Sequence, residues 1–303
     1  MQGSLAAPTS IGSGLGLAGR IAAYLPLLKP RIIVLLGLYG AVSALVAGGG
    51  RVASGRLLLF TVLALMAAGA AACLNHLFER KTDALMERTR NRPLPSGRVS
   101  PTAAAWLAGT LLAVSVPAAW IWLNGAVAVQ LALGAAIYSG LYTLVLKRRT
   151  SWNIVIGGLA GSSMALAGWA VVEPQLSAGA WLMALLVFLW TPPHFWGLAV
   201  VRDADYRAAS IPMLPQVAGV NRTARSMAGY SVALWFTSLA LLPLTGLGWA
   251  YGAAALILGA VFTAGCVAFA RRPTPRLAAT IFKGSGAYLG LLLLAMVADL
   301  WLL

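Results

Sequence analysis

Charged residues are scarce in this sequence, and acidic residues are the scarcest of them. The 303 residues include only seven aspartates and glutamates; charged residues make up 10% of the chain and hydrophobic residues 60%. In soluble domains about a quarter of the residues are charged. With a mean hydropathy of +0.84, the composition excludes an ordinary soluble domain and predicts an integral membrane protein.

Cysteine is also rare, and the N-terminal segment lacks charge. Cys73 and Cys266 both lie inside apolar runs and do not have the C-x-x-C spacing of a redox or metal site, so we expect them to be small packing residues. Residues 1–19 carry no charge, which is not typical of a signal or transit peptide. We expect residues 1–24 to form a disordered cytoplasmic tail.

Long apolar runs are abundant. Nine of them are continuous and long enough to cross roughly 30 Å of hydrocarbon as helices: residues 29–49, 56–78, 103–123, 125–146, 152–171, 178–200, 227–247, 249–270 and 281–302. Membrane-spanning strands would instead alternate over about ten residues. The sequence therefore predicts an all-α fold, a polytopic membrane helical bundle of nine transmembrane helices, forming one domain over residues 25–303.

The net charge of +15 is explained by the positions of the basic residues and not by a nucleic-acid partner. All of them except Arg51 and Arg56 fall on one side of the nine predicted spans. Basic loops stay in the cytoplasm. We therefore expect a protein embedded in the lipid of a bacterial inner membrane, with its N-terminus in the cytoplasm and its C-terminus outside.

The acidic residues cluster on the same side, in the loops after the second and sixth predicted spans. Asn75, Glu79 and Asp83 are spaced four residues apart, so on a helix their side chains form one polar stripe. Oxygen ligands of this kind suit Mg²⁺, which takes one or two carboxylates and bridges to substrate phosphates. A solvated helix end, with the carboxylates paired to Arg80 or Lys81, is an equally good interpretation.

Arginines follow this stripe in a segment rich in proline. The run "RTRNRPLPSGR", from Arg88 through Arg92 to Arg98, predicts a rigid extended loop. Guanidinium groups bind phosphate oxygens bidentately, as a metal-bridged diphosphate requires. The alternative is that these residues only anchor a cytoplasmic loop.

The loop after the sixth predicted span repeats the pattern. Asp205 precedes Pro215 by ten residues, as Asp83 precedes Pro93. This weak internal duplication predicts two acidic rims that face each other and hold metal and diphosphate between them.

Several polar residues lie within the predicted spans or at their ends. Pro192 and Pro193 remove two backbone donors, so the helix is expected to kink or open there. His194 follows, and a histidine inside a span is a functional candidate; a hydrogen bond to a carbonyl freed by the prolines is the alternative.

The fourth and fifth predicted spans add further candidates. Tyr142 adds a phenol, and Lys147 is either a phosphate-binding cation or a loop anchor. Four glycines of the fifth span permit close packing or leave room for a flat ligand: Gly157, Gly158, Gly161 and Gly168.

With these segments the chain resembles the UbiA-type membrane prenyltransferases, and within them the protohaem IX farnesyltransferases. The resemblance covers about residues 25–300 and is carried by "DALMERTRNRPLPSGRVSP", "YTLVLKRRTSWNIVIGG" and "WTPPHFWGLAVVRDADYRAASIPMLP". It implies an Mg²⁺-dependent transfer of a farnesyl group from farnesyl diphosphate to a vinyl group of haem b, with water added, giving haem O and diphosphate. A downstream haem-modifying enzyme is a further candidate partner.

The resemblance also implies roles for individual residues. The metal ligands would be Asn75, Glu79, Asp83 and Asp205, and the residues near the diphosphate Arg88, Arg92, Lys147 and Arg202. Asp83, Asp205 and Tyr142 would be catalytic, and His194, with Trp196 beside it, would contact haem. The chain departs from the usual pattern at Glu79 and Lys81, where aspartates are common, and at Val201, where the second motif usually begins with aspartate.

Two other functions fit part of the pattern. A UbiA-type enzyme that prenylates an aromatic quinone precursor fits everything except the Pro-Pro-His-Phe-Trp run. A transporter with a duplicated half and a broken helix would also carry a polar residue within the membrane. Against the transporter, the carboxylates gather at one mouth and alternate with arginines.

Overall fold

The computed structural model describes residues 17–302, and these residues form only helices and loops. In chain order the helices are α1 (Leu17–Tyr24), η1 (Leu25–Leu28), α2 (Pro30–Ala47), α3 (Ser54–Asp83), α4 (Pro101–Trp122), α5 (Gly125–Ala135), η2 (Ala136–Leu146), α6 (Asn153–Gly157), α7 (Leu159–Ala170), α8 (Ala178–Val201), α9 (Asp203–Ala208), α10 (Leu214–Ala240), α11 (Leu242–Thr245), α12 (Trp249–Arg271) and α13 (Pro275–Leu302). The prediction of an all-α membrane bundle is confirmed.

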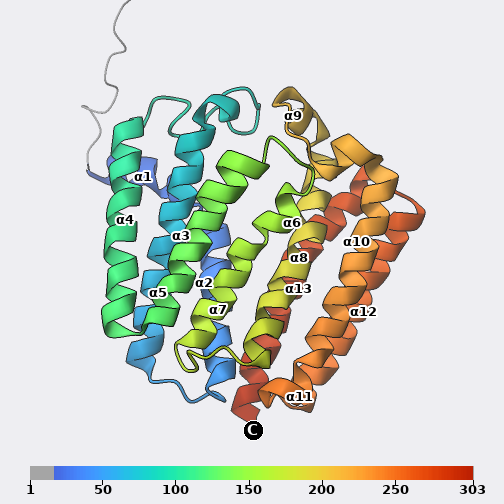
Figure 1. The fold of residues 1–303 in the computed structure, drawn as a ribbon. Coiled ribbons are helices and arrows are strands. Elements are labelled where there is room, and N and C mark those ends of the chain that lie inside the picture. The colour runs from blue at the N-terminus through green and yellow to red at the C-terminus, as the bar shows by residue number, and fades with distance from the viewer. Residues whose placement is uncertain (1–16, 303) are drawn as a thin grey trace, which may run out of the picture.

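The predicted count of nine spans is not confirmed. Within residues 17–302, eight helical segments have the length and hydropathy of membrane spans: α2, α3, α4, α5 with η2, α6 with α7, α8, α12 and α13. The span predicted at 227–247 falls on α10, which carries Arg222 and Arg225 in its first half and ends at Ala240. It is therefore less apolar than expected, although it runs beside α8 and α12 through the bundle (Figure 1).

The predicted tail also differs from the structure. Residues 1–16 lie outside the described residues. Residues 17–24, which the prediction placed in the disordered tail, form helix α1. Their sequence, LAGRIAAY, is mostly apolar and is followed directly by η1.

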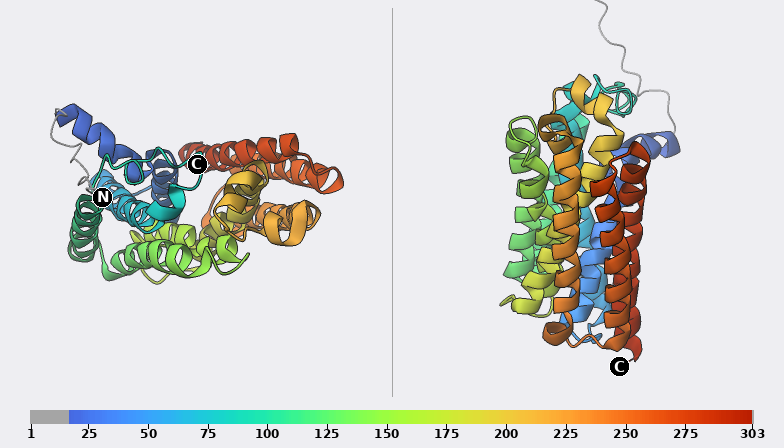
Figure 2. Two further views of the ribbon diagram at one scale, coloured as in Figure 1. Left: turned by 90° about the horizontal axis from the view of Figure 1, so that it is seen from above. Right: turned by 90° about the vertical axis from the view of Figure 1, so that its right-hand side faces the viewer.

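The helices are arranged around the bundle almost in chain order (Figure 2). Neighbours in sequence pack together, as α3 does with α4 and α12 with α13, and α13 also packs against α2 and α8. The loop after α3 and helix α9 lie at one end of the bundle, whereas the C-terminal end of α13 lies at the other (Figure 1). The two loops in which acidic residues cluster thus meet at the same end.

The two remaining acidic residues have structural partners at the opposite end. Trp169 Nε1 donates a hydrogen bond to Glu173 Oε2 at 2.6 Å. The buried carboxylate of Asp299 accepts from the backbone N–H of Tyr251 at 3.0 Å and from that of Gly248. It therefore satisfies donors at the N-terminus of α12, which would otherwise lack partners.

Helices α2 and α7 cross at a pair of glycines. A Cβ built on Gly168 would lie 1.9 Å from the carbonyl oxygen of Gly40. Nearby, Ser43 Oγ donates to the Ala165 carbonyl at 2.8 Å. Such small residues let helix backbones approach closely in a membrane, where lipid offers as apolar a surface as leucine does. At Gly168, the packing interpretation of the span 5 glycines is therefore correct.

We expect Gly168→Ala to destabilise the protein by about 1–3 kcal/mol or more, because the new methyl group collides with backbone that cannot move independently. Thermal unfolding of the detergent-solubilised protein measures this. Gly229→Ala on α10 is the matched control, since a Cβ there meets no atom within 4 Å. Equal melting temperatures for the two variants would contradict the crossing described here.

Candidate active site

The predicted polar stripe forms the last two turns of α3 and faces a cavity. Asn75, Glu79 and Asp83 are 1%, 6% and 4% exposed, so they do not form a solvated helix end. The same cavity is lined by the cations Lys29, Arg88, Arg92 and Lys147 and by the phenols Tyr138, Tyr142 and Tyr206. We call it the polar cavity. It brings together seven of the residues predicted for the site: Asn75, Glu79, Asp83, Arg88, Arg92, Tyr142 and Lys147.

The stripe is paired with cations from other parts of the chain. Lys147 forms an ion pair with Glu79 Oε1, and Arg92 Nη1 donates to Asp83 Oδ2 at 2.8 Å. The predicted alternative, pairing with Arg80 or Lys81, is therefore not what the structure shows. The loop after α3 folds back over this helix. Arg92, which follows Asp83 by nine residues, thereby reaches the Asp83 carboxylate.

Lys29 is a site residue that the sequence interpretation missed. Its Nζ donates to Asn75 Oδ1 at 2.5 Å and to the Tyr138 hydroxyl at 3.1 Å. A left-handed backbone conformation, with φ of 49°, places it in the turn between η1 and α2. Burial, and then the charge of Arg92, lower its pKa to about 7. The available signal was a lysine directly before the first span, which the positive-inside rule already explained.

We expect Lys29→Met to weaken binding of a diphosphate substrate roughly tenfold or more, because a hydrogen bond to a charged group contributes about 1.5–3 kcal/mol. The KM for that substrate, determined from diphosphate release, measures the effect. Arg31→Gln, an exposed cation two residues away, controls for net charge. If Lys29→Met had the same KM as Arg31→Gln, Lys29 would have no part in binding the substrate.

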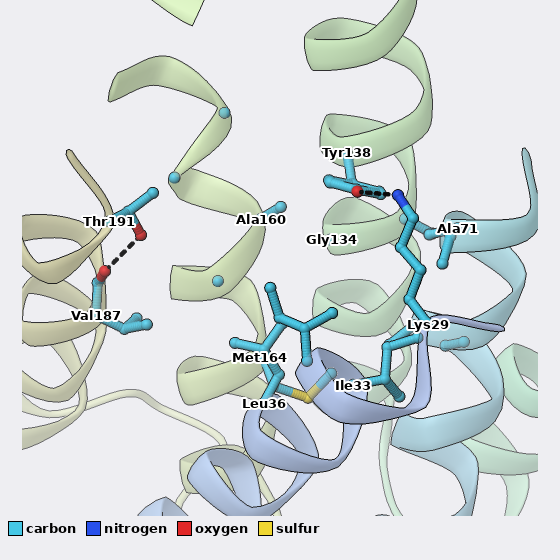
Figure 3. A pocket seen from close by; sticks show the side chains of 18 of the residues that line it. Lys29, Ile33, Leu36, Ala71, Gly134, Tyr138, Ala160, Met164, Val187 and Thr191 are labelled. Atoms are coloured by element: carbon cyan, nitrogen blue, oxygen red, sulfur yellow. Dashed lines mark hydrogen bonds between the residues drawn. The ribbon is translucent and has the colours of Figure 1, made fainter. Parts of the chain in front are cut away.

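An apolar chamber adjoins the polar cavity. Its empty space, open solvent included, is about 900 Å³. It is enclosed by α2, α3, α5 with η2, α6 with α7, and α8; Figure 3 shows Ile33, Leu36, Met164 and Val187 within it. Four residues line both spaces: Lys29, Ile32, Tyr138 and Phe195. The chamber therefore borders the polar cavity.

Glycines shape the wall of this chamber. Gly157, Gly158 and Gly161 all line it, and a Cβ on Gly161 would lie 3.3 Å from Val187 Cγ2, so these glycines border the chamber and also permit close packing. Gly157 also accommodates Tyr142, because a Cβ there would lie 2.6 Å from the Tyr142 ring. Tyr142 stacks on Tyr138, which lines both spaces, with ring centroids 5.7 Å apart, and this packing fixes the Tyr142 ring in the wall of the polar cavity.

The second predicted rim is only partly in place. Tyr206 of α9 lines the polar cavity, but Asp205 and Arg202 are not among the described residues that do so. Arg202 is exposed and Asp205 half-buried. In the described structure the carboxylates that line the cavity both come from α3.

Asp203, to which the sequence gave no role, holds the start of α10 against α9. It accepts from Arg207 Nε at 2.7 Å and from Gln216 Nε2 at 2.8 Å. The hydrogen bond from Arg207 lowers the pKa of Asp203. Asp203 is thus engaged by Arg207 and Gln216, and it is not among the described residues that line the polar cavity.

Helix α8 carries the residues predicted to contact haem. It continues as one α-helix across Pro192 and Pro193, so the predicted opening is not present. His194 is half-buried, and its Nδ1 lies 2.7 Å from Ser285 Oγ of α13. Trp196 is 2% exposed and packs edge-on against Tyr230. Neither is among the described residues that line the chamber or the polar cavity.

The oxygen donors of the polar cavity fit a magnesium ion that is shared with a substrate. Within residues 17–302, no three His, Cys, Asp or Glu side chains form a metal-binding cluster. Two carboxylates and the Asn75 amide are too few for a closed cage, but Mg²⁺ characteristically takes one or two carboxylates and completes its shell with waters and phosphates. The surrounding cations suit the phosphate oxygens of such a complex.

The comparisons with known proteins show the family of the chain. The model of the UbiA prenyltransferase family matches residues 34–296. The chain is 42% identical over 290 residues to the protoheme IX farnesyltransferase of Thermosynechococcus vestitus, covering 95% of this chain and 91% of that protein. It is 40% identical over 277 residues to the protein of that name from Legionella pneumophila strain Lens, covering 91% and 94%.

Solved structures share the fold at low sequence identity. A digeranylgeranylglyceryl phosphate synthase superposes with a TM-score of 0.78 at 17% identity, covering 94% of this chain and 99% of that one. A UbiA homologue from Archaeoglobus fulgidus, bound to GPP and Mg²⁺, gives 0.65 at 15% identity, covering 91% and 99%. The match of the family model across most of the chain, together with relatives above 40% identity, establishes that the chain belongs to the UbiA prenyltransferase family.

Proposed function

We propose that the protein transfers a farnesyl group from farnesyl diphosphate to a vinyl group of haem b, producing haem O and diphosphate. The observation that carries this proposal is the junction of a cation-rich polar cavity with an apolar chamber, in a chain whose relatives at about 40% identity bear the name protoheme IX farnesyltransferase. The junction matches a substrate that has a charged head and a hydrocarbon tail.

In this proposal the polar cavity stabilises the leaving diphosphate. Lys29, Arg88, Arg92 and Lys147 line the cavity and would donate to its oxygens as the allylic C–O bond breaks. Asn75, Glu79 and Asp83 would hold Mg²⁺, which when bound neutralises charge on the diphosphate. Asp205 and Arg202 remain predicted ligands from the second rim.

The apolar chamber would hold the farnesyl chain and exclude water from the allylic cation. A vinyl group of haem then attacks C1 of the farnesyl unit, forming a carbon–carbon bond. Water captures the resulting cation beside the porphyrin, and the released proton passes to diphosphate. Tyr142, which lines the polar cavity, would orient the diphosphate end of the chain, and exclusion of bulk water from the chamber prevents earlier hydrolysis.

We further propose that His194 contacts the haem from α8, with Trp196 supporting the helix against α10. We also propose that the polar cavity faces the cytoplasm across a bacterial inner membrane, with the C-terminal end of α13 outside, because basic loops stay in the cytoplasm. A haem-modifying enzyme that consumes haem O would act downstream.

An acceptor comparison tests the proposal. Purified protein is given farnesyl diphosphate and Mg²⁺ with either haem b or an aromatic acid that serves as a quinone precursor, and diphosphate release is followed. We expect release that depends on haem. Release that depends on the aromatic acid would support the alternative UbiA-type reaction. If neither acceptor led to release, both reactions would be contradicted.

A further inference from the structure

The contact between His194 and Ser285 joins two helices that are far apart in sequence. His194 Nδ1 lies 2.7 Å from Ser285 Oγ, and the two residues are 91 positions apart on α8 and α13. Ser285 is fully buried, with 0% exposure. Trp190 reinforces the same contact, since its Nε1 donates to the Ser285 carbonyl at 2.7 Å and its ring stacks on the His194 imidazole at 4.4 Å.

The single hydroxyl proton of Ser285 has two acceptors within reach. Its Oγ lies 2.7 Å from the carbonyl oxygen of Phe282, one turn earlier on α13, and the same distance from His194 Nδ1. If the proton goes to Nδ1, only one of the two hydrogen bonds forms, and the imidazole keeps its proton on Nε2. If it goes to Phe282, His194 Nδ1–H can donate to Ser285 Oγ and both bonds form.

The surroundings of Nε2 favour the second arrangement. Within residues 17–302 Nε2 forms no hydrogen bond, and the imidazole is flanked by the rings of Trp190, Phe195 and Phe282. The Trp190 N–H already donates to the Ser285 carbonyl. An N–H donor left without a partner in such surroundings costs free energy. Placing the proton on Nδ1 makes one more hydrogen bond and leaves on Nε2 a lone pair.

We infer that Ser285 is a positioning residue that holds His194 in the Nδ1–H tautomer, with the Nε2 lone pair presented to the iron of the haem substrate. Histidines that bind metals characteristically donate their other N–H to an acceptor, which fixes the ring orientation and makes the ligating nitrogen more basic. Neutral imidazole is the form that binds haem iron. This inference rests on the proposed function, because it takes haem as the acceptor.

The location of His194 is consistent with this role. The next residue, Phe195, lines both the apolar chamber and the polar cavity. His194 itself lines neither space, so a porphyrin held by it would lie against α8 next to the residue that borders both. Unlike the nitrogens of His76, those of His194 are not among the fully buried atoms that lack a partner.

Nitrogen NMR of the substrate-free protein tests the tautomer directly. The chain has two histidines, so ¹⁵N-histidine labelling gives two ring systems, and the signals lost in His194→Gln belong to His194. We expect the wild type to show a protonated Nδ1 and an unprotonated Nε2. We expect Ser285→Ala to show a mixture of tautomers. A protonated Nε2 in the wild type, or the same tautomer in Ser285→Ala, would overturn the inference.

Haem titration tests whether the tautomer serves the substrate. Following the Soret band, we expect Ser285→Ala to bind haem b roughly 10–100-fold more weakly, the usual cost of losing a partner of a metal ligand. Ser231→Ala is the matched control, because Ser231 is also buried and bonds to a carbonyl one turn earlier; it should bind haem normally. Unchanged affinity in Ser285→Ala would overturn the role in haem binding, while haem O formation, measured separately, would still support the proposed function.

Discussion

Replacing Asp83 with asparagine is expected to lower turnover roughly 10²–10³-fold, the loss observed when one preorganised electrostatic group is removed from an active site. Asp83 is 4% exposed and accepts from Arg92 at 2.8 Å. Asparagine keeps the size of the side chain but removes the charge that holds Arg92 and that, in the proposed function, also holds a divalent cation. Initial rates of diphosphate release over a series of Mg²⁺ concentrations measure the effect, and the variant should need more Mg²⁺ for half-maximal rate.

Glu87→Gln is the control for this experiment. Glu87 lies four residues after Asp83 and is exposed, so the substitution changes net charge equally without reaching the cavity. Its turnover and Mg²⁺ dependence should match the wild type. If Asp83→Asn also matched the wild type at every Mg²⁺ concentration, Asp83 would have no part in the site.

Replacing Lys147 with methionine is expected to lower both stability and turnover. The ion pair with Glu79 is buried, with side-chain exposures of 14% and 8%. Removing one partner of such a pair leaves an uncompensated charge, which costs about 3–5 kcal/mol. The same substitution removes a cation that lines the proposed diphosphate position. Thermal unfolding and the rate of diphosphate release report the two effects separately.

A double variant distinguishes the structural role of this pair from its catalytic role. Glu79→Gln combined with Lys147→Met removes both charges, so it should regain most of the lost stability, as expected for two groups in contact. Its turnover should stay low, because the proposed metal ligand and the proposed diphosphate ligand are then both absent. Recovery of turnover together with stability would mean that the pair only supports the fold.

Much of the fold could be predicted because membrane spans are encoded locally. Long apolar runs between basic loops predict the helices, and the helical period predicts that Asn75, Glu79 and Asp83 share one face. Prediction was less successful where polar residues interrupt a run. In α10, Arg222 and Arg225 lower the hydropathy and the helix ends at Ala240. The span predicted at residues 227–247 is therefore not among the eight candidate membrane spans of the described residues.

The site was predictable to the extent that it depends on residues close together in the sequence. Arg92 lies nine residues from Asp83, and both belong to the segment whose composition drew attention first. Lys29 and Ser285 depend on contacts that only the packed bundle creates, at separations of 46 and 91 residues from their partners. The orientation of Asp205 depends on the contacts by which Asp203 holds α9 against α10. The ten-residue spacing between Asp205 and Pro215 does not encode those contacts.

The most direct test of the central claim is the mass of haem recovered after the purified protein is incubated with haem b, farnesyl diphosphate and Mg²⁺. We expect a haem species heavier by one farnesyl group and one hydroxyl group, formed together with an equal amount of diphosphate and formed roughly 10²–10³-fold more slowly with Asp83→Asn. Haem recovered at its original mass, from protein that is folded and binds both substrates, would contradict the account.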